Sequence, residues 1–243
     1  MRLQEKTAVV TGGGTGIGQA IALALAAEGC QVIVTGRRQE KLQESVSARA
    51  ETPSILAHCM DVADRQSVDH FFHWVNENQL KVDILVNAAG TNVRDRSMQA
   101  IDPADWDRLL QIHATGSYNC MHAVLPQMRE RRNGLIVNIS SVAGKRASQL
   151  AGFAYSAAKS AQAALGTAVG LEVAEFGVRV TNVYPGEVDT AILDQRPTPV
   201  SHAHRAKILQ PTDVADAVLM IACLPPRAHV PEIVIKPTWQ PYT

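Results

Sequence analysis

The chain has 243 residues, 46% of them hydrophobic and 19% charged, and its 23 basic residues balance 23 acidic ones. This composition is typical of a globular protein and excludes a disordered or fibrous one. Zero net charge argues against a nucleic-acid partner, and no apolar run reaches the ~18–20 residues of a membrane span.

The beginning of the chain and its cysteines bear on the cellular compartment. The start, MRLQEKTAVV, runs directly into a strand-like stretch and lacks the apolar core of a signal peptide. The four cysteines, Cys30, Cys59, Cys120 and Cys223, form no C-x-x-C pair and have the spacing of neither a zinc site nor a disulfide framework. We therefore expect a cytoplasmic protein with free thiols, no bound metal and no membrane contact.

Short β-branched runs alternate with segments of helical apolar period along the chain. Strands are predicted at Thr7–Thr11, Val32–Thr35, Ser54–Cys59, Ile84–Val86, Leu135–Ile139, Val178–Val183 and Glu232–Ile235. Helices are predicted at Ile17–Glu28, Arg38–Arg49, Gln66–Asn76, Ala104–Arg129, Tyr155–Phe176 and Asp213–Cys223. Right-handed crossovers in such a chain place helices on both faces of a parallel sheet.

The expected fold is therefore α/β, with one Rossmann-type, doubly wound domain over residues 1–243. Its seven-stranded parallel sheet is flanked by helices on both faces. The stretch 191–210 is irregular and contains Pro197 and Pro199. A long loop inside a compact α/β domain is more often a binding loop than filler, so we expect a short substrate lid there.

A glycine-rich turn joins the first strand to the first helix. It reads Thr11-Gly-Gly-Gly-Thr-Gly-Ile-Gly18, so that Gly12, Gly16 and Gly18 give the spacing G-x-x-x-G-x-G. Glycines let the backbone turn sharply and let a pyrophosphate approach the N–H groups at the helix N-terminus. Such a turn can also simply connect strand to helix, but the strand–turn–helix context favours a dinucleotide site.

The end of the second strand indicates which dinucleotide binds. Cofactors with a free 2′-hydroxyl are usually held by an acid about 20 residues beyond the glycines. Here Arg37 and Arg38 occupy that place, and the first acid is Glu40. Two guanidiniums suit a 2′-phosphate, although a solvated start to the next helix is the alternative. We expect NADP(H) in preference to NAD(H).

Tyr155 and Lys159 stand four residues apart, on one face of a predicted helix. A nearby ammonium favours the phenolate, so Lys159 is expected to lower the pKa of Tyr155 from its ordinary value of about 10. The pair could then exchange a proton with a hydroxyl or carbonyl oxygen. Most such pairs are merely helix surface, so the interpretation depends on the motifs around them.

Several motifs together resemble the short-chain dehydrogenase/reductase family. They are the glycine turn, Asp61-Val62, Asn87-Ala-Ala-Gly90, Ser140-Ser141, Tyr155 with Lys159, and Pro185-Gly186-Glu-Val-Asp-Thr190. Their order and spacing match the family along nearly the whole chain. The segment from Val230 to Tyr242 is similar to an NADP-dependent branch that contains 3-hydroxy acid and serine dehydrogenases.

The resemblance implies a role for each matching residue. Tyr155 would be the proton donor and acceptor, Lys159 would lower its pKa and bind the nicotinamide ribose, and Ser141 would hydrogen-bond the substrate oxygen. Ser141 is preferred to Ser140 because it directly precedes the small apolar pair Val142-Ala143, and only one of the two serines can face the cleft. The implied cofactor contacts are Gly12, Gly14, Thr15, Gly16, Ile17, Gly18, Arg37, Arg38, Asp61, Val62, Asn87, Gly90, Tyr155, Lys159, Pro185, Gly186, Val188 and Thr190.

Two positions depart from the family pattern. Ala88 replaces an asparagine that normally supports the central strand, and His113 stands where members usually carry a catalytic asparagine. That asparagine anchors a water in the proton relay from lysine. The His113 imidazole could hold the same water and titrate near neutral pH. In the alternative, it is a packed helix residue, and backbone carbonyls carry the relay.

Basic side chains are expected around the substrate end of the cleft. Arg94, Arg96, Lys145, Arg146 and Arg196 could receive a carboxylate, or they form a solvated rim. The predicted function is an NADP(H)-dependent oxidoreductase that interconverts a secondary alcohol and a ketone on a small polar substrate, with a 3-hydroxy or 3-oxo acid as one candidate. The alternatives are an imine or other carbonyl reductase, and a nucleotide-sensing regulator with weak turnover.

The predicted helix Tyr155–Phe176 bears on assembly. Its alanines at 157, 158, 161, 163, 164 and 168 and its larger apolar residues spread around more of the helix than one sheet face covers. Alanine is also simply the best helix former. The resemblance implies that this helix and Ala104–Arg129 pair across two-fold axes, so we expect a homo-oligomer, either a tetramer or a dimer.

Overall fold

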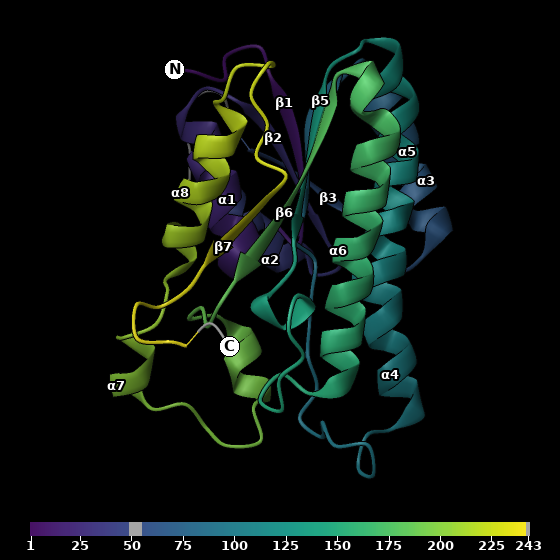
Figure 1. The fold of residues 1–243 in the computed structure, drawn as a ribbon. Helices are drawn as coiled ribbons and strands as arrows, with labels where there is room; N and C mark the ends of the chain where they lie inside the picture. The colour runs from purple at the N-terminus through teal and green to yellow at the C-terminus, as the bar shows by residue number, and fades with distance from the viewer. Residues whose placement is uncertain (49–54, 242–243) are drawn as a thin grey trace.

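The computed structural model describes residues 1–48 and 55–241. Its centre is a seven-stranded parallel sheet in the order β3-β2-β1-β4-β5-β6-β7, which lies between two layers of helices (Figure 1). The strands are β1 (Thr7–Thr11), β2 (Gln31–Gly36), β3 (Ile55–Cys59), β4 (Val82–Asn87), β5 (Gly134–Ile139), β6 (Val178–Pro185) and β7 (Glu232–Ile235). The predicted fold class is confirmed. Three residues that the sequence analysis assigned, Arg49, Ser54 and Tyr242, lie outside the described residues.

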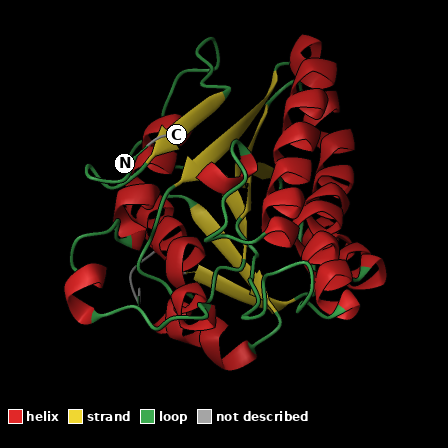
Figure 2. Ribbon diagram, turned by 60° about the horizontal axis from the view of Figure 1, so that its bottom comes forward, coloured by secondary structure: helices red, strands yellow, loops and turns green. Residues whose placement is uncertain are grey.

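Each face of the sheet is covered by its own group of helices (Figures 1 and 2). One group is α1 (Gly16–Ala27), α2 (Gln39–Ser47) and α8 (Pro211–Ala222), and the other is α3 (Arg65–Glu77), α5 (Gly116–Glu130) and α6 (Phe153–Val173). The helix α4 (Pro103–Leu110) continues the second layer beyond the carboxyl ends of the strands. No helix within the described ranges is long and apolar enough to cross a membrane.

Alternate residues of each strand enter two different cores, because successive side chains of a strand point to opposite faces. In β1, Ala8 and Val10 pack with Leu25 of α1, whereas Val9 packs with Phe71 of α3 and Met121 of α5. The same alternation holds in β2, β4 and β5. Burial on both faces explains why these strands are continuous apolar runs in the sequence.

The predicted helix Ala104–Arg129 is divided by one irregular turn. It begins at Pro103, where the Asp102 side chain accepts a hydrogen bond from the backbone N–H of Ala104 at 2.9 Å. Residues Gln111–Thr115 then form a π-helical turn between α4 and α5. The expectation of one regular helix is wrong at this turn, which carries His113. Single π turns of this kind are frequently found at functional sites.

Candidate active site

A cleft of about 220 Å³ opens at the carboxyl ends of β1, β2 and β4. The strand β1 pairs with β2 on one side and with β4 on the other. The strands β2 and β3 are added on one side of β1, and the strands from β4 to β7 are added on the other side, so the strand order reverses at β1. Ligands of open α/β sheets bind at such a switch point. The predicted cofactor contacts that line the cleft are Gly12, Gly14, Thr15, Gly16, Ile17, Gly18, Arg37, Arg38, Asp61, Val62, Gly90, Tyr155, Lys159 and Thr190.

The glycine turn leaves a cradle at the N-terminus of α1. Gly12 and Gly16 have φ angles of 65° and 56°, in the left-handed region that favours glycine. A Cβ on Gly18 would collide with the carbonyl oxygen of Gly12. The first turn of α1 contains no acidic residue, and the Thr15 side chain does not cap it. Its N–H groups therefore remain available, so the cradle fits the pyrophosphate of a dinucleotide.

Positive side chains gather where β2 ends. Arg37 and Arg38 are exposed there, and Lys41 of α2 also lines the cleft. Asp61 is the one acidic residue among the described residues that line the cleft, and it lies 4.0 Å from the Arg37 guanidinium. Lys41 was missed by the sequence analysis. The position of Lys41 four residues after Arg37, on a predicted helix, was the sequence feature that could have indicated that the two cations lie close together.

Tyr155 lies between the cleft and an adjoining cavity of about 140 Å³, and it lines both. Ser140 and Ser141 both line this cavity, and Ser140 also lines the cleft, so the expectation that only one serine can face the site is wrong. Ser141 is hydrogen-bonded to the Tyr155 side chain, whereas the Ser140 hydroxyl donates to the Lys159 carbonyl at 3.0 Å. Burial raises the pKa of Tyr155 to about 12, although Ser141 and the positive charge of Arg96 act in the opposite direction.

The shift in the Tyr155 pKa is opposite to the predicted direction. The Lys159 amine lies 5.8 Å from the centroid of the Tyr155 ring and donates instead to the Ile139 carbonyl at 2.7 Å and to Gln162 Oε1 at 3.0 Å. Burial lowers the pKa of Lys159 itself to about 7, so its charge at neutral pH is incomplete. The sequence pattern placed the two groups on one helix face but could not show how deeply both are buried.

Gln162 is a second residue that the sequence analysis missed. Its side chain is fully buried and accepts from Lys159, while its amide donates to the Ser117 hydroxyl at 2.8 Å. The Ser117 hydroxyl in turn donates to the His113 carbonyl at 2.8 Å. A hydrogen-bonded chain thus connects Lys159 with the π-helical turn. From the sequence, the position of Gln162 three residues after Lys159 indicated only that the two residues share a helix face.

His113 is fully buried beside Gly90 and lines the cleft. Its Nε2 lies 2.8 Å from the Thr91 carbonyl oxygen. Burial and the nearby Lys159 lower the pKa of His113 well below its ordinary value, despite the bond to Thr91. The expectation that His113 titrates near neutral pH is therefore wrong, because burial, and to a lesser extent the positive charge of Lys159, disfavours protonation of the ring.

Four of the predicted cofactor contacts do not line the dinucleotide cleft. Asn87 is buried in the sheet, where its amide donates to Asn138 Oδ1 at 2.9 Å, and the Asn138 amide donates to Asn182 Oδ1 at 3.1 Å. These three residues stand opposite one another in β4, β5 and β6 and form a polar row across the sheet. The other three, which line the adjoining cavity and not the cleft, are Pro185, Gly186 and Val188.

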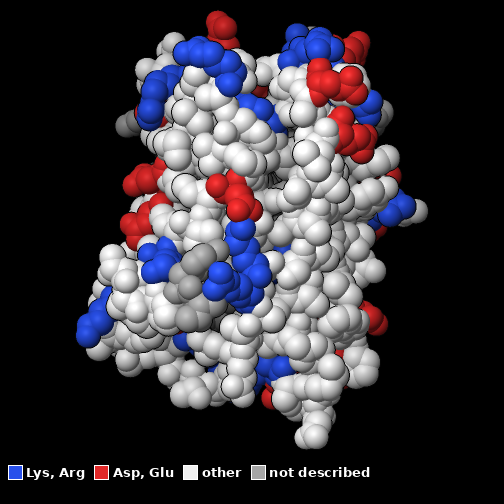
Figure 3. Space-filling model, viewed as in Figure 1, with Lys and Arg blue, Asp and Glu red and all other residues white. Residues whose placement is uncertain are grey.

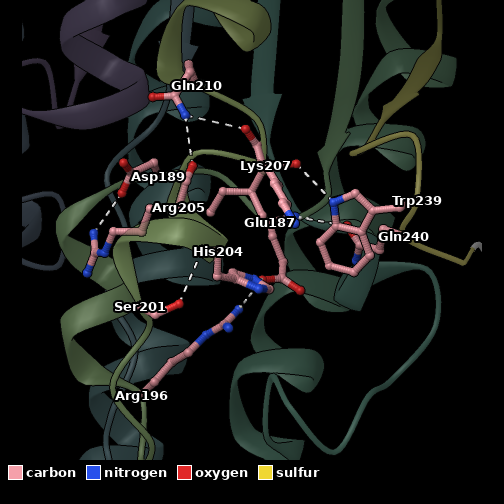
Figure 4. Close-up of polar contacts among 11 residues, drawn as sticks. Glu187, Asp189, Arg196, Ser201, His204, Arg205, Lys207, Gln210, Trp239 and Gln240 are labelled. Atoms are coloured by element: carbon pink, nitrogen blue, oxygen red, sulfur yellow. Dashed lines mark hydrogen bonds and ion pairs between the residues drawn. The ribbon is translucent and has the colours of Figure 1, made fainter.

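The stretch 191–210 is more ordered than predicted, and ion pairs hold it against the end of β6 (Figure 4). It contains a short 3-10 helix, Ala191–Gln195, and the helix α7 (His202–Arg205). Arg205 contacts Asp189 at 2.7 Å and also pairs with Asp194. The sequence pattern showed the prolines of this segment but not its ionic contacts.

Comparison with known proteins agrees with this architecture. The family model of the short chain dehydrogenase matches residues 6–200. An uncharacterized oxidoreductase of Staphylococcus aureus (strain USA300) is 34% identical over 235 residues, which cover 97% of this chain and 98% of the relative.

Two solved structures are similar over almost their whole length. The closed form of a serine dehydrogenase complexed with NADP+ has a TM-score of 0.88 and 28% identity, covering 97% of this chain and 96% of that one. An alcohol dehydrogenase from the archaeon Thermococcus sibiricus, complexed with 5-hydroxy-NADP, has a TM-score of 0.87 and 26% identity, covering 97% and 98%.

The sheet order, the glycine cradle and the cleft at the switch point define a dinucleotide-binding domain of the Rossmann type. The chain belongs to the short-chain dehydrogenase family, whose members use a nicotinamide nucleotide.

Proposed function

We propose that the protein is an NADP(H)-dependent oxidoreductase that interconverts a secondary alcohol and a ketone on a small polar substrate. The observation that carries this proposal is the position of Tyr155, which lines both the dinucleotide cleft and the adjoining cavity. A phenol between the two spaces can exchange a proton with a substrate oxygen while the substrate carbon faces the cofactor.

The cofactor would lie along the cleft from Arg37 to Tyr155. The Gly12–Gly18 cradle would hold the pyrophosphate, and Arg37 with Arg38 and Lys41 would hold a 2′-phosphate. The NADP complexes of the two similar structures support this choice of nucleotide. When bound, the nicotinamide ring would take a hydride from the substrate carbon in oxidation and return it in reduction.

The side chains of the cavity would manage the proton and the substrate oxygen. In oxidation, the substrate C–H and O–H bonds break, a C=O bond forms, and the O–H proton passes to the Tyr155 oxygen. In reduction, Tyr155 returns that proton. Ser141 would hydrogen-bond the substrate oxygen and favour the phenolate of Tyr155. Lys159 would bind the ribose, and His113 would hold the relay water.

The test is a turnover assay with NADP+ and alcohols, and with NADPH and ketones or imines, following the absorbance of the reduced nicotinamide. Conversion of secondary alcohols and ketones supports the proposal. Conversion of imines alone supports an imine reductase. Tight nucleotide binding without turnover in either direction supports a nucleotide-sensing regulator, the alternative from another functional class.

We also propose that the protein is a homo-oligomer, either a tetramer or a dimer. Ala164, Ala168 and Leu171 of α6 are exposed, and Figure 3 shows almost no charged side chains over the middle of this helix. Small apolar residues on an uncovered helix allow a second helix to approach closely.

We further propose that 191–210 acts as a substrate lid. We also propose that the protein works in the cytoplasm, where its four thiols stay free.

A further inference from the structure

The dinucleotide cleft adjoins the cavity at Tyr155, and the cavity adjoins a second hollow nearer the surface. This outer hollow is lined by residues that include Arg94, Leu150 and Pro197. The cavity is smaller than the ~300–1,000 Å³ of sites for drug-sized ligands, at about 140 Å³. It shares Tyr155 and Ser140 with the dinucleotide cleft, and it shares Arg96 and Arg196 with the outer hollow. A substrate whose oxygen lies at Tyr155 therefore directs its far end toward two arginines.

Arg96 is held by neutral partners only. Its guanidinium donates to three backbone carbonyls, from Nε to Val93 at 2.6 Å, from Nη1 to Leu150 at 2.6 Å and from Nη2 to Gln195 at 2.9 Å. No carboxylate of the described chain forms an ion pair with it. A guanidinium has five N–H donors, so two donors and the full positive charge remain for a ligand. The half-buried charge acts on Tyr155, whose pKa it lowers.

The other charges at this cavity are already paired. Arg196 and His204 both contact Oε2 of the Glu187 carboxylate, at 3.0 and 2.7 Å (Figure 4). Arg96, Arg196 and Glu187 are the charged side chains among the described residues that line the cavity. Lys145, another basic residue expected here, pairs with Glu232 at 2.6 Å. The excess positive charge of the cavity therefore lies on Arg96.

We propose that Arg96 binds a carboxylate group of the substrate, so that the substrate class is a short hydroxy acid and its oxo acid. This inference rests on the alcohol–ketone chemistry of the proposed function. A guanidinium with spare donors binds a carboxylate through short, charge-assisted hydrogen bonds, and these are stronger where water is partly excluded. The small cavity limits the substrate to a few carbons between the carboxylate and the reacting carbon.

A purely structural role for Arg96 makes a different prediction. Its three bonds also tie together the backbone near residues 93, 150 and 195. If Arg96 only held these segments, its loss would affect charged and neutral substrates alike. A comparison of each acid with its own neutral ester separates the two roles.

The first experiment measures kcat/KM with NADP+ for 2-, 3- and 4-hydroxy acids and for the methyl ester of each. We expect wild-type protein to favour the best acid over its ester by about 10–100-fold, the effect of hydrogen bonds to a charged group. Arg96→Gln should lower kcat/KM for the acid by about 10–100-fold more than for its ester, so that the preference for the acid is lost. Arg96→Lys should retain part of the preference. Arg227→Gln, at an exposed arginine in the loop after α8, is the matched control.

The second experiment uses binding in place of turnover. Calorimetry of the NADP+-loaded protein should detect butanoate but not butanamide, and Arg96→Gln should remove the butanoate signal. Equal use of acids and esters by the wild type, an equal loss of both in Arg96→Gln, or equal binding of butanoate and butanamide overturns the inference. If acids, esters and simple secondary alcohols all fail to react, the proposed function fails, while calorimetry still tests Arg96.

Discussion

The His113 imidazole and the Tyr155 ring form a T-shaped pair, with the ring centroids 5.3 Å apart and the ring planes at 85°. Gly90 leaves space for this contact, because a Cβ there would come within 2.8 Å of His113 Cε1. The buried Nδ1 of His113 has no hydrogen-bond partner among the described residues. With Nε2–H donating to the Thr91 carbonyl, Nδ1 of the neutral ring is an acceptor that a water could satisfy.

We therefore expect the polar atom of His113, and not its bulk alone, to matter for turnover. His113→Leu should lower kcat at least about tenfold, since it cannot hold a relay water, whereas His113→Asn should keep most of the wild-type rate. Steady-state kinetics with the fastest substrate measures the difference. If both variants lose the same amount, His113 is only a packing residue of the π-helical turn.

The cofactor preference depends on the cations at the end of β2. NADPH should bind more tightly than NADH, and Arg37→Asp should erode or reverse that preference, because a carboxylate repels a 2′-phosphate and accepts from a 2′-hydroxyl. Fluorescence titration with both nucleotides measures the two affinities. Arg227→Asp, at an exposed arginine in the loop after α8, makes the same charge change as a control. Equal affinities in the wild type contradict the assignment.

The buried Lys159 predicts a pH-dependent stability in the cofactor-free protein. Its pKa falls from 10.5 to about 7 on folding, so between pH 7 and 9 the unfolded chain holds a proton that the folded chain has partly released. The free energy of unfolding then rises with pH through this group. In the wild type, Lys159 should make the free energy of unfolding rise by on the order of 1 kcal/mol per pH unit in this range, and we expect Lys159→Met to remove that contribution.

Denaturant unfolding at several pH values measures this slope. Lys81→Met replaces an exposed lysine in the same way and should leave the slope as it is in the wild type. Parallel curves for the wild type and Lys159→Met would mean that the amine keeps its proton in the folded protein.

The uncovered face of α6 predicts the assembly state. Light scattering at micromolar concentration should give a mass two or four times the 26.2 kDa of one chain. Leu171→Glu places a charge in this face and should shift the protein toward the monomer, because a carboxylate in an apolar interface loses its hydration. Met98→Glu, at another exposed apolar residue, serves as the control. A wild-type mass near that of one chain refutes the oligomer.

The sequence was sufficient for features that depend on local pattern. The β-branched run Thr7–Thr11 predicted β1 with its observed bounds, since a strand buried on both faces has no polar interruption. The spacing of Tyr155 and Lys159 placed both on α6 because helix geometry alone decides which residues share a face.

Features that depend on packing could not be predicted in the same way. The π-helical turn at His113 has the same apolar period as the α-helices beside it, so no residue marks it. The direction of the Tyr155 pKa shift follows from burial, which outweighs the nearby charges. The lack of a counter-ion for Arg96 depends on carbonyls from segments distant in the chain, and these meet only in the folded protein.

The central claim, that Tyr155 transfers the proton of a hydride exchange with NADP(H), is tested most directly by isotope transfer. NADPH deuterated at the transferable C4 position is incubated with the fastest carbonyl substrate, and the product is examined by mass spectrometry. We predict one deuterium on the new carbinol carbon, and a rate that falls about 10²–10⁴-fold in Tyr155→Phe but not in the control Tyr118→Phe, while NADPH binding persists. Unlabelled product, or a Tyr155→Phe variant as fast as the wild type, would contradict the account.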